Sequence, residues 1–116
     1  MPIVSFNNDD AFAALPAPIP VKEPIGEPVA ETRSVATQGQ GASRVGVWEC
    51  TPGVWRRQIV QAEMCVILSG KAVFEPDGGE PVSVEAGTTH YFPPNSLGIW
   101  RILETTRKIF ITFNEG

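Results

Sequence analysis

The chain has 116 residues, of which 42% are hydrophobic, and it carries a formal net charge of −4 at pH 7. This length suits one globular domain with its own core, and the acidic balance argues against nucleic acid, whose phosphates need clustered Lys and Arg. No apolar run approaches the roughly 20 residues that span a bilayer, and the N-terminus lacks the basic start of a secretory signal, so we expect a soluble, cytoplasmic protein that contacts no membrane.

Residues 1–28 carry six of the eleven prolines, and this composition predicts an extended N-terminal arm. Within it, the stretch NDDAFAAL favours one short helical turn capped by Asn8 or Asp9. The arm also holds five large apolar residues, which would cost solubility if exposed: Ile3, Val4, Phe6, Phe12 and Leu15. We therefore expect the arm to lie along another surface, such as that of a partner subunit.

From residue 29 onward, strand patterns alternate with turn signals, and no helical period is found. In 107–113, for example, Ile109, Ile111 and Phe113 fall on one side of a strand. The expected strands are 29–37, 44–50, 54–60, 63–76 with a break at Gly70, 81–86, 88–92, 97–104 and 107–113. Short strands at this spacing predict an all-β sandwich or barrel over residues 29–116.

A first motif lies between residues 53 and 70. Glu63 is followed by six residues and then Gly70, and Gly53 lies ten residues before Glu63. This pattern resembles the first motif of the cupins, G(X)5HXH(X)3–4E(X)6G, in a shortened form. The paired histidines of the motif are absent, because residues 54–62 read VWRRQIVQA.

A second motif begins at Gly87, and Pro93 follows it at the spacing of the second cupin motif, G(X)5PXG(X)2H(X)3N. Asn95 replaces the next glycine, Gly98 replaces the histidine, and Ile102 replaces the final asparagine. Together the two stretches resemble a small single-domain cupin of the group that includes the cupin domain of (S)-ureidoglycine aminohydrolase. The resemblance covers roughly residues 45–113. It implies a double-sheet jelly-roll barrel and, in active members, a divalent metal held by three histidines and one glutamate.

Only Glu63 survives of the four metal ligands that the resemblance implies. One carboxylate does not hold a metal tightly, so no metal cofactor is expected. Strand alternation places Glu63 and Cys65 on one face, and His90, the only histidine, shares a face with Phe92. If a divalent metal binds, these residues would hold it: Glu63, His90 and Cys65. Otherwise Cys50 and Cys65 are buried free thiols and His90 is a hydrogen-bonded core residue.

Seven residues are candidates for lining a ligand pocket in the barrel: Trp48, Arg57, Glu63, Cys65, His90, Tyr91 and Trp100. The tryptophans either fill the core or form the walls of a pocket. Arg56 and Arg57 alternate, so one of them should face inward, where its charge would need an anion; otherwise both reach solvent. Tyr91 lies either at the pocket rim or on the surface.

The function expected from these residues is that of a small-molecule-binding cupin with a degenerate metal site, which recognises a small polar or anionic metabolite. One alternative is an enzyme of the ureidoglycine aminohydrolase type, using a metal or His90 as acid and base. Another is a structural dimer without a pocket. A homodimer is expected in each case, because sheet edges and an apolar arm both need to be covered.

Overall fold

The structure is a computed structural model that describes residues 3–38 and 43–113. Apart from one short helix, the described chain forms antiparallel β-structure, which confirms the all-β prediction. In chain order the elements are α1 (Asn8–Ala13), β1 (Ile19–Pro20), β2 (Glu31–Gln38), β3 (Arg44–Cys50), β4 (Gly53–Ile59), β5 (Ala62–Pro76), β6 (Val82–Glu85), β7 (Thr89–Phe92) and β8 (Ser96–Phe113).

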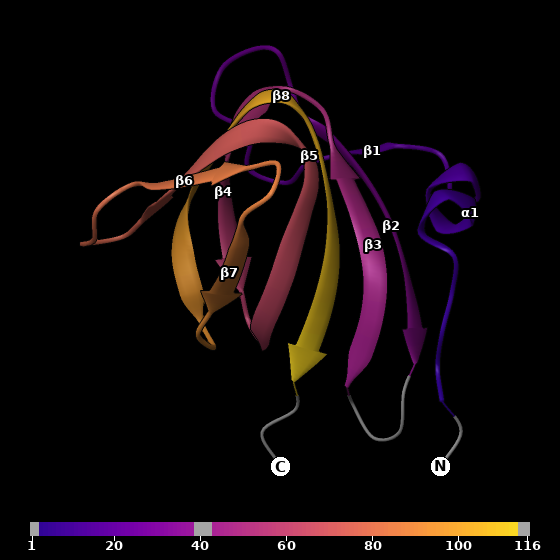
Figure 1. Cartoon of the computed structure of the whole chain (residues 1–116). Coiled ribbons are helices and arrows are strands. Elements are labelled where there is room, and N and C mark those ends of the chain that lie inside the picture. Colours follow the sequence, from indigo (N-terminus) through magenta and orange to yellow (C-terminus); the bar gives the residue numbers. More distant parts are fainter. Residues whose placement is uncertain (1–2, 39–42, 114–116) are drawn as a thin grey trace.

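Two long strands, β5 and β8, connect the two layers of the barrel (Figure 1). The first half of β5 and the second half of β8 lie in one layer with β1, β2, β3 and β7. The other halves of these strands lie in a second layer with β4 and β6. This double-sheet arrangement is the jelly-roll barrel that the sequence predicts.

Strand β5 passes from one layer to the other near Gly70, where its pairing with β8 shifts register. Gly70 has a φ of +98°, and a Cβ atom there would lie 2.4 Å from the carbonyl oxygen of Thr105. Glycine is needed for this conformation and this close approach. The predicted break at Gly70 is therefore wrong, because the strand bends and continues. Segments 97–104 and 107–113 likewise belong to one strand, β8, rather than to two.

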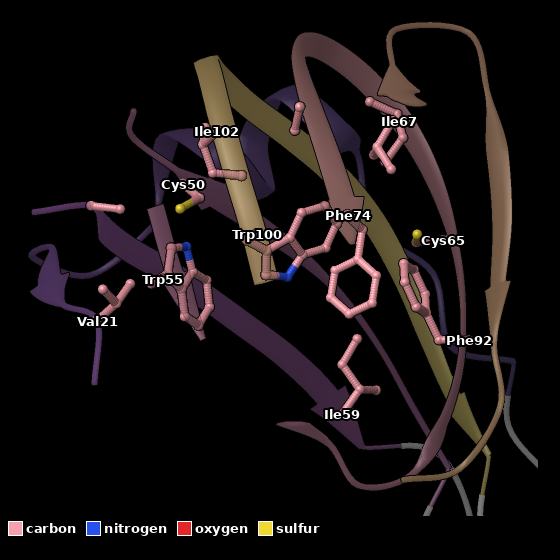
Figure 2. Packing of buried hydrophobic residues seen from close by; sticks show 13 residues of the cluster. Val21, Cys50, Trp55, Ile59, Cys65, Ile67, Phe74, Phe92, Trp100 and Ile102 are labelled. Atoms are coloured by element: carbon pink, nitrogen blue, oxygen red, sulfur yellow. The ribbon is translucent and has the colours of Figure 1, made fainter. Parts of the chain in front are cut away.

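The core lies between the two layers and centres on the rings of Phe74, Phe92 and Trp100 (Figure 2). The ring centroids of Phe74 and Trp100 are 4.9 Å apart, and those of Phe74 and Phe92 are 5.2 Å apart, both in edge-to-face geometry. Such pairs stabilise a core beyond the area they bury. Because Phe92 comes from one layer and the other two rings from the opposite layer, this cluster packs the two sheets together.

Helix α1 begins one residue earlier than the predicted caps allow. Asn7 is the N-cap, and its Oδ1 atom accepts a hydrogen bond of 3.1 Å from the backbone N–H of Asp10. The prediction of Asn8 or Asp9 as the cap is therefore wrong. All three residues have a suitable side chain, and only the backbone conformation distinguishes them.

The described part of the N-terminal arm lies against its own barrel (Figure 1). Helix α1 contacts β3, and Phe12 is buried with the guanidinium of Arg107 4.9 Å from its ring centre. Further along, β1 pairs with β2, and Val21 joins the hydrophobic core. Phe12 and Val21 of the arm are thus covered by this chain itself, whereas Ile3 is 93% exposed.

Candidate functional site

A cavity of about 160 Å³ lies between the two layers, with walls from β2, β3, β4, β5 and β8. We call it the inner cavity. It is lined by Ser34, Trp48, Arg57, Ile59, Glu63, Trp100, Lys108, Phe110 and Thr112. Four of the seven predicted pocket residues, Trp48, Arg57, Glu63 and Trp100, therefore lie around one space.

The inner cavity contains a buried ion pair. The Nζ atom of Lys108 donates a hydrogen bond of 2.7 Å to Oε2 of Glu63, and the two side chains are only 6% and 9% exposed. Lys108 lies on β8 and Glu63 on the paired strand β5, and both point inward. Burying either charge alone would be costly, and the contact between the two offsets part of that cost.

Aromatic rings surround the ammonium group of Lys108. Its Nζ atom lies 4.5 Å from the ring centre of Trp48, 5.7 Å from that of Trp100 and 6.0 Å from that of Phe92. The negative face of an aromatic ring attracts a cation within this range, most strongly where water is excluded. The rings and Glu63 together hold a positive charge at a fixed place in the barrel.

The two adjacent arginines of β4 have different roles. Arg56 pairs with Asp77 on the surface. Arg57 lines the inner cavity and also two shallower hollows that flank it. Its guanidinium lies 6.0 Å from the ring centre of Trp55. Of the two arginines, Arg57 is therefore the one placed to meet an anion entering the cavity.

Thr112 adds a polar group to the same wall. Its Oγ1 atom is buried and has no hydrogen-bond partner within residues 3–38 and 43–113. A buried hydroxyl without a partner is costly, and most such groups in folded proteins are satisfied. A ligand that enters the inner cavity could supply the missing partner.

Three of the predicted pocket residues lie outside the inner cavity. Cys65 is buried in the core directly opposite His90 on the neighbouring strand. His90 borders a separate hollow of about 350 Å³ near β6 and β7. Tyr91 borders the same hollow and is 59% exposed. Burial raises the pKa of the Cys65 thiol, and burial raises that of Cys50 to about 12, so both thiols are protonated at neutral pH.

The interior does not fit the metal site of the cupin motifs. Counted back from Glu63 with the three-residue spacer, the paired histidine positions fall on Arg57 and Ile59. At Gly98, the third histidine position, a Cβ atom would lie 2.7 Å from the ring of Phe74. Within the described part of the chain, no three His, Cys, Asp or Glu side chains are arranged to hold a metal ion.

The alternative metal set of Glu63, Cys65 and His90 shares one face, as the alternation of the strands predicts. Each of these residues is otherwise engaged. Glu63 is bound to Lys108, and the thiol of Cys65 is packed in the core. The Nε2 atom of His90 lies 2.8 Å from Oγ1 of Thr88. Since that hydroxyl donates its own proton to the carbonyl of Glu85, it accepts a hydrogen bond from His90.

Replacing His90 with glutamine should make the stability of the protein less sensitive to mild acid. Burial, and then the positive charge of Lys108, hold the pKa of His90 below its ordinary value of 6.5. As the pH falls below that value, the unfolded chain binds a proton that the folded chain resists, so stability falls. Urea unfolding between about pH 7 and pH 5 should show a smaller loss for His90→Gln than for the wild type. Equal losses would contradict this result.

Sequence analysis missed Lys108 and Thr112. The strand pattern drew attention to Ile109, Ile111 and Phe113, but these residues face outward, and the inward face carries Lys108, Phe110 and Thr112. The available signal was weak, because Lys108 follows Arg107 and Thr106 and only the residues after it are apolar.

None of the helices in the part of the chain that the structure describes is both long and apolar enough to cross a membrane.

Solved structures of known proteins resemble this chain in fold. No curated protein matches it. The Clostridium difficile EutQ protein shares 16% identity over 72% of this chain and 68% of its own, with a TM-score of 0.64. A DUF861-family protein from Pseudomonas syringae shares 21% identity over 86% of this chain and 43% of its own, with a TM-score of 0.72. A Rhizobium leguminosarum protein shares 16% identity over 99% of this chain and 100% of its own, with a TM-score of 0.72.

The TM-scores of these structures show a shared fold, and the family is shown by the sequence match. The sequence model of the EutQ-like cupin domain family matches residues 37–110, which is well over half of the chain. The matched region contains Glu63 and every lining residue of the inner cavity except Ser34 and Thr112. The chain therefore belongs to the EutQ-like cupin domain family.

Proposed function

We propose that this cupin binds a small anionic or polar metabolite in its inner cavity without using a metal. The observation that carries the proposal is the buried Lys108–Glu63 pair beside Arg57 in one cavity. Two positive side chains and one negative side chain give that cavity a net positive charge. A cavity of about this volume can hold a molecule the size of benzene.

The charges and the walls of the inner cavity suit recognition by shape, hydrogen bonds and one acidic group. Trp48 and Trp100 supply flat apolar walls, which bind the body of a small ligand. Arg57 presents a planar fork of N–H donors that matches carboxylate and phosphate oxygens. Glu63 and Lys108 are almost fully buried, so their charges act more strongly there than at an open surface.

A thermal-shift screen with small carboxylates, phosphate, amines and sugars tests the proposal. A ligand at about 100 times its Kd should raise the free energy of unfolding by about 2.7 kcal/mol. Binding should also change the fluorescence of Trp48 and Trp100, which line the cavity. A flat response across the whole set would contradict the proposal and favour a purely structural role for the barrel.

Replacing Arg57 with methionine should weaken binding of the best anion by roughly 10–100-fold, because a charged hydrogen bond is lost. Arg56→Met is the matched control, since Arg56 is adjacent in the chain but pairs with Asp77 on the surface. Isothermal titration of both variants measures the two affinities. Equal losses in both variants would show that Arg57 has no special role in recognition.

The finer resemblance, to the ureidoglycine aminohydrolase group, would add amide or amine chemistry assisted by a metal. The donor set around Glu63 does not fit a metal ion, and His90 lies at a different hollow from the inner cavity. The proposal therefore remains one of binding, and a turnover assay with small amides and ureido compounds would extend it to catalysis.

We also propose that the protein forms a homodimer through the outer side of its first layer. Five apolar side chains of β3, β5 and β8 lie there in adjacent registers, and we call them the outer face: Val45, Met64, Val66, Ile109 and Ile111. Val66 is 37% exposed in the single chain. A contiguous apolar face of this kind favours association, and two copies related by a two-fold axis would cover it.

A further inference from the structure

We propose that the ammonium group of Lys108 takes the place of the metal ion in this barrel, and that it binds the carboxylate group of a small ligand. The first half of this inference stands on the geometry of the residues alone. The second half rests on the proposed function, because it names the ligand class of the same cavity.

The glutamate of the first cupin motif is the strongest support. Glu63 occupies the position that would ligate a metal, and its Oε2 atom instead accepts a hydrogen bond of 2.7 Å from Lys108 Nζ. The carboxylate therefore contacts a cation, as it would in a metal site, but that cation belongs to the chain. The pair is buried, so the two charges hold each other in place without competition from bulk water.

The surroundings of the ammonium group are those of an organic cation. Trp48, Trp100 and Phe92 face it with their rings, which attract a cation but donate no lone pair that could coordinate a metal. The other positions of the motif agree, because Arg57 and Ile59 replace the paired histidines. A metal ion beside Arg57 and Lys108 would meet two positive charges and a single carboxylate.

The same arrangement indicates a carboxylate as the ligand. Lys108 has three N–H donors, and Glu63 accepts from one of them, so the ammonium group can also donate to a ligand oxygen. The hydroxyl of Thr112, which has no hydrogen-bond partner among the described residues, lines the same cavity and could bind the ligand as well. Arg57 can complete the contact with its planar fork. The volume of about 160 Å³ limits the body of the acid to about the size of a benzene ring.

Cobalt binding in a matched pair of variants tests whether Lys108 replaces the metal. Arg57→His with Ile59→His restores the paired histidines beside Glu63 while Lys108 remains. We expect this variant to bind Co²⁺ no better than the wild type. Adding Lys108→Met frees Glu63 and should raise the affinity for Co²⁺ by at least roughly 10–100-fold, measured by absorption spectroscopy and elemental analysis. Equal Co²⁺ binding with and without Lys108, or one tightly bound Co²⁺ per wild-type chain, would overturn the inference.

A second measurement uses the wild-type chain and therefore does not depend on whether the variants fold. In protein with ¹⁵N-labelled lysine, the side-chain resonance of Lys108 should be displaced from those of exposed lysines by the rings around it. Added Zn²⁺ should leave it unchanged, whereas a Zn²⁺-dependent shift would overturn the replacement of the metal by Lys108.

Matched acid and amide probes test the ligand class with the same resonance. Acetate or benzoate should shift the Lys108 signal, and acetamide or benzamide, which have the same shape without the charge, should not. Equal shifts from acids and amides would overturn the carboxylate assignment while leaving binding in the cavity intact. No shift from any probe, together with a flat thermal screen, would reject the proposed function but not the replacement of the metal.

Discussion

Replacing Lys108 with methionine is expected to lower the free energy of unfolding by about 3–5 kcal/mol. Methionine retains most of the apolar stem of lysine, so the variant removes the charge with little change in volume. Glu63 would then be a buried carboxylate without its partner, and such a group pays its desolvation cost uncompensated. Because whole domains are stable by only about 5–15 kcal/mol, the loss should be large in urea unfolding at neutral pH.

The double variant Lys108→Met with Glu63→Leu separates the cost of a broken pair from the value of the intact one. It removes both charges and fills their space with apolar atoms, so its stability should return to that of the wild type or exceed it. Arg101→Met is the surface control, because Arg101 pairs with Glu75 where both side chains are partly exposed. That variant should leave the unfolding midpoint almost unchanged. A Lys108→Met variant as stable as the Arg101→Met variant would contradict the idea of a buried charge pair.

The intact pair therefore need not contribute to stability at all. An ion pair that could be replaced by apolar residues without loss is better explained by what its charges do than by what they stabilise. In this barrel they keep a cation fixed against aromatic walls in a cavity that a small molecule can enter. This argument connects the expected stability of the two variants to the proposed binding function.

Most of the barrel could be predicted from the sequence, because strand periodicity and turn residues act locally. Strand β6 (Val82–Glu85) follows directly from the alternation of its residues. The turn around Gly78 follows from glycine's tolerance of positive φ. The continuity of β5 and β8 could not be predicted in this way. A bend at Gly70 and a break at Gly70 look the same in one sequence, and only pairing with a distant strand distinguishes them.

In the candidate site, too, some residues could be predicted from the sequence and others could not. Glu63 could be found because a motif spacing marks it, and Arg57 was one of two alternatives that strand alternation left open. Lys108 escaped because its neighbours Ile109 and Ile111 gave β8 an apolar face that looked like the core side. The inward face of this segment carries Lys108 and Thr112 beside Phe110, so apolar periodicity alone points to the wrong side of the strand.

Ile109 and Ile111 point outward and belong to the outer face, which we propose as the dimer interface. Replacing Val66 on this face with glutamate should convert the dimer into a monomer. Val66 lies on the outer face, cross-strand from Ile109, and is 37% exposed, so a single chain can accommodate the charge. In a two-fold interface each substitution appears twice, and both carboxylates would be buried without partners. Sedimentation velocity should then show the dimer for the wild type and the monomer for Val66→Glu.

Leu103→Glu, at an exposed apolar position outside the outer face, should remain dimeric. A monomeric wild type, or a Val66→Glu variant that stays dimeric, would show that this face is not the interface.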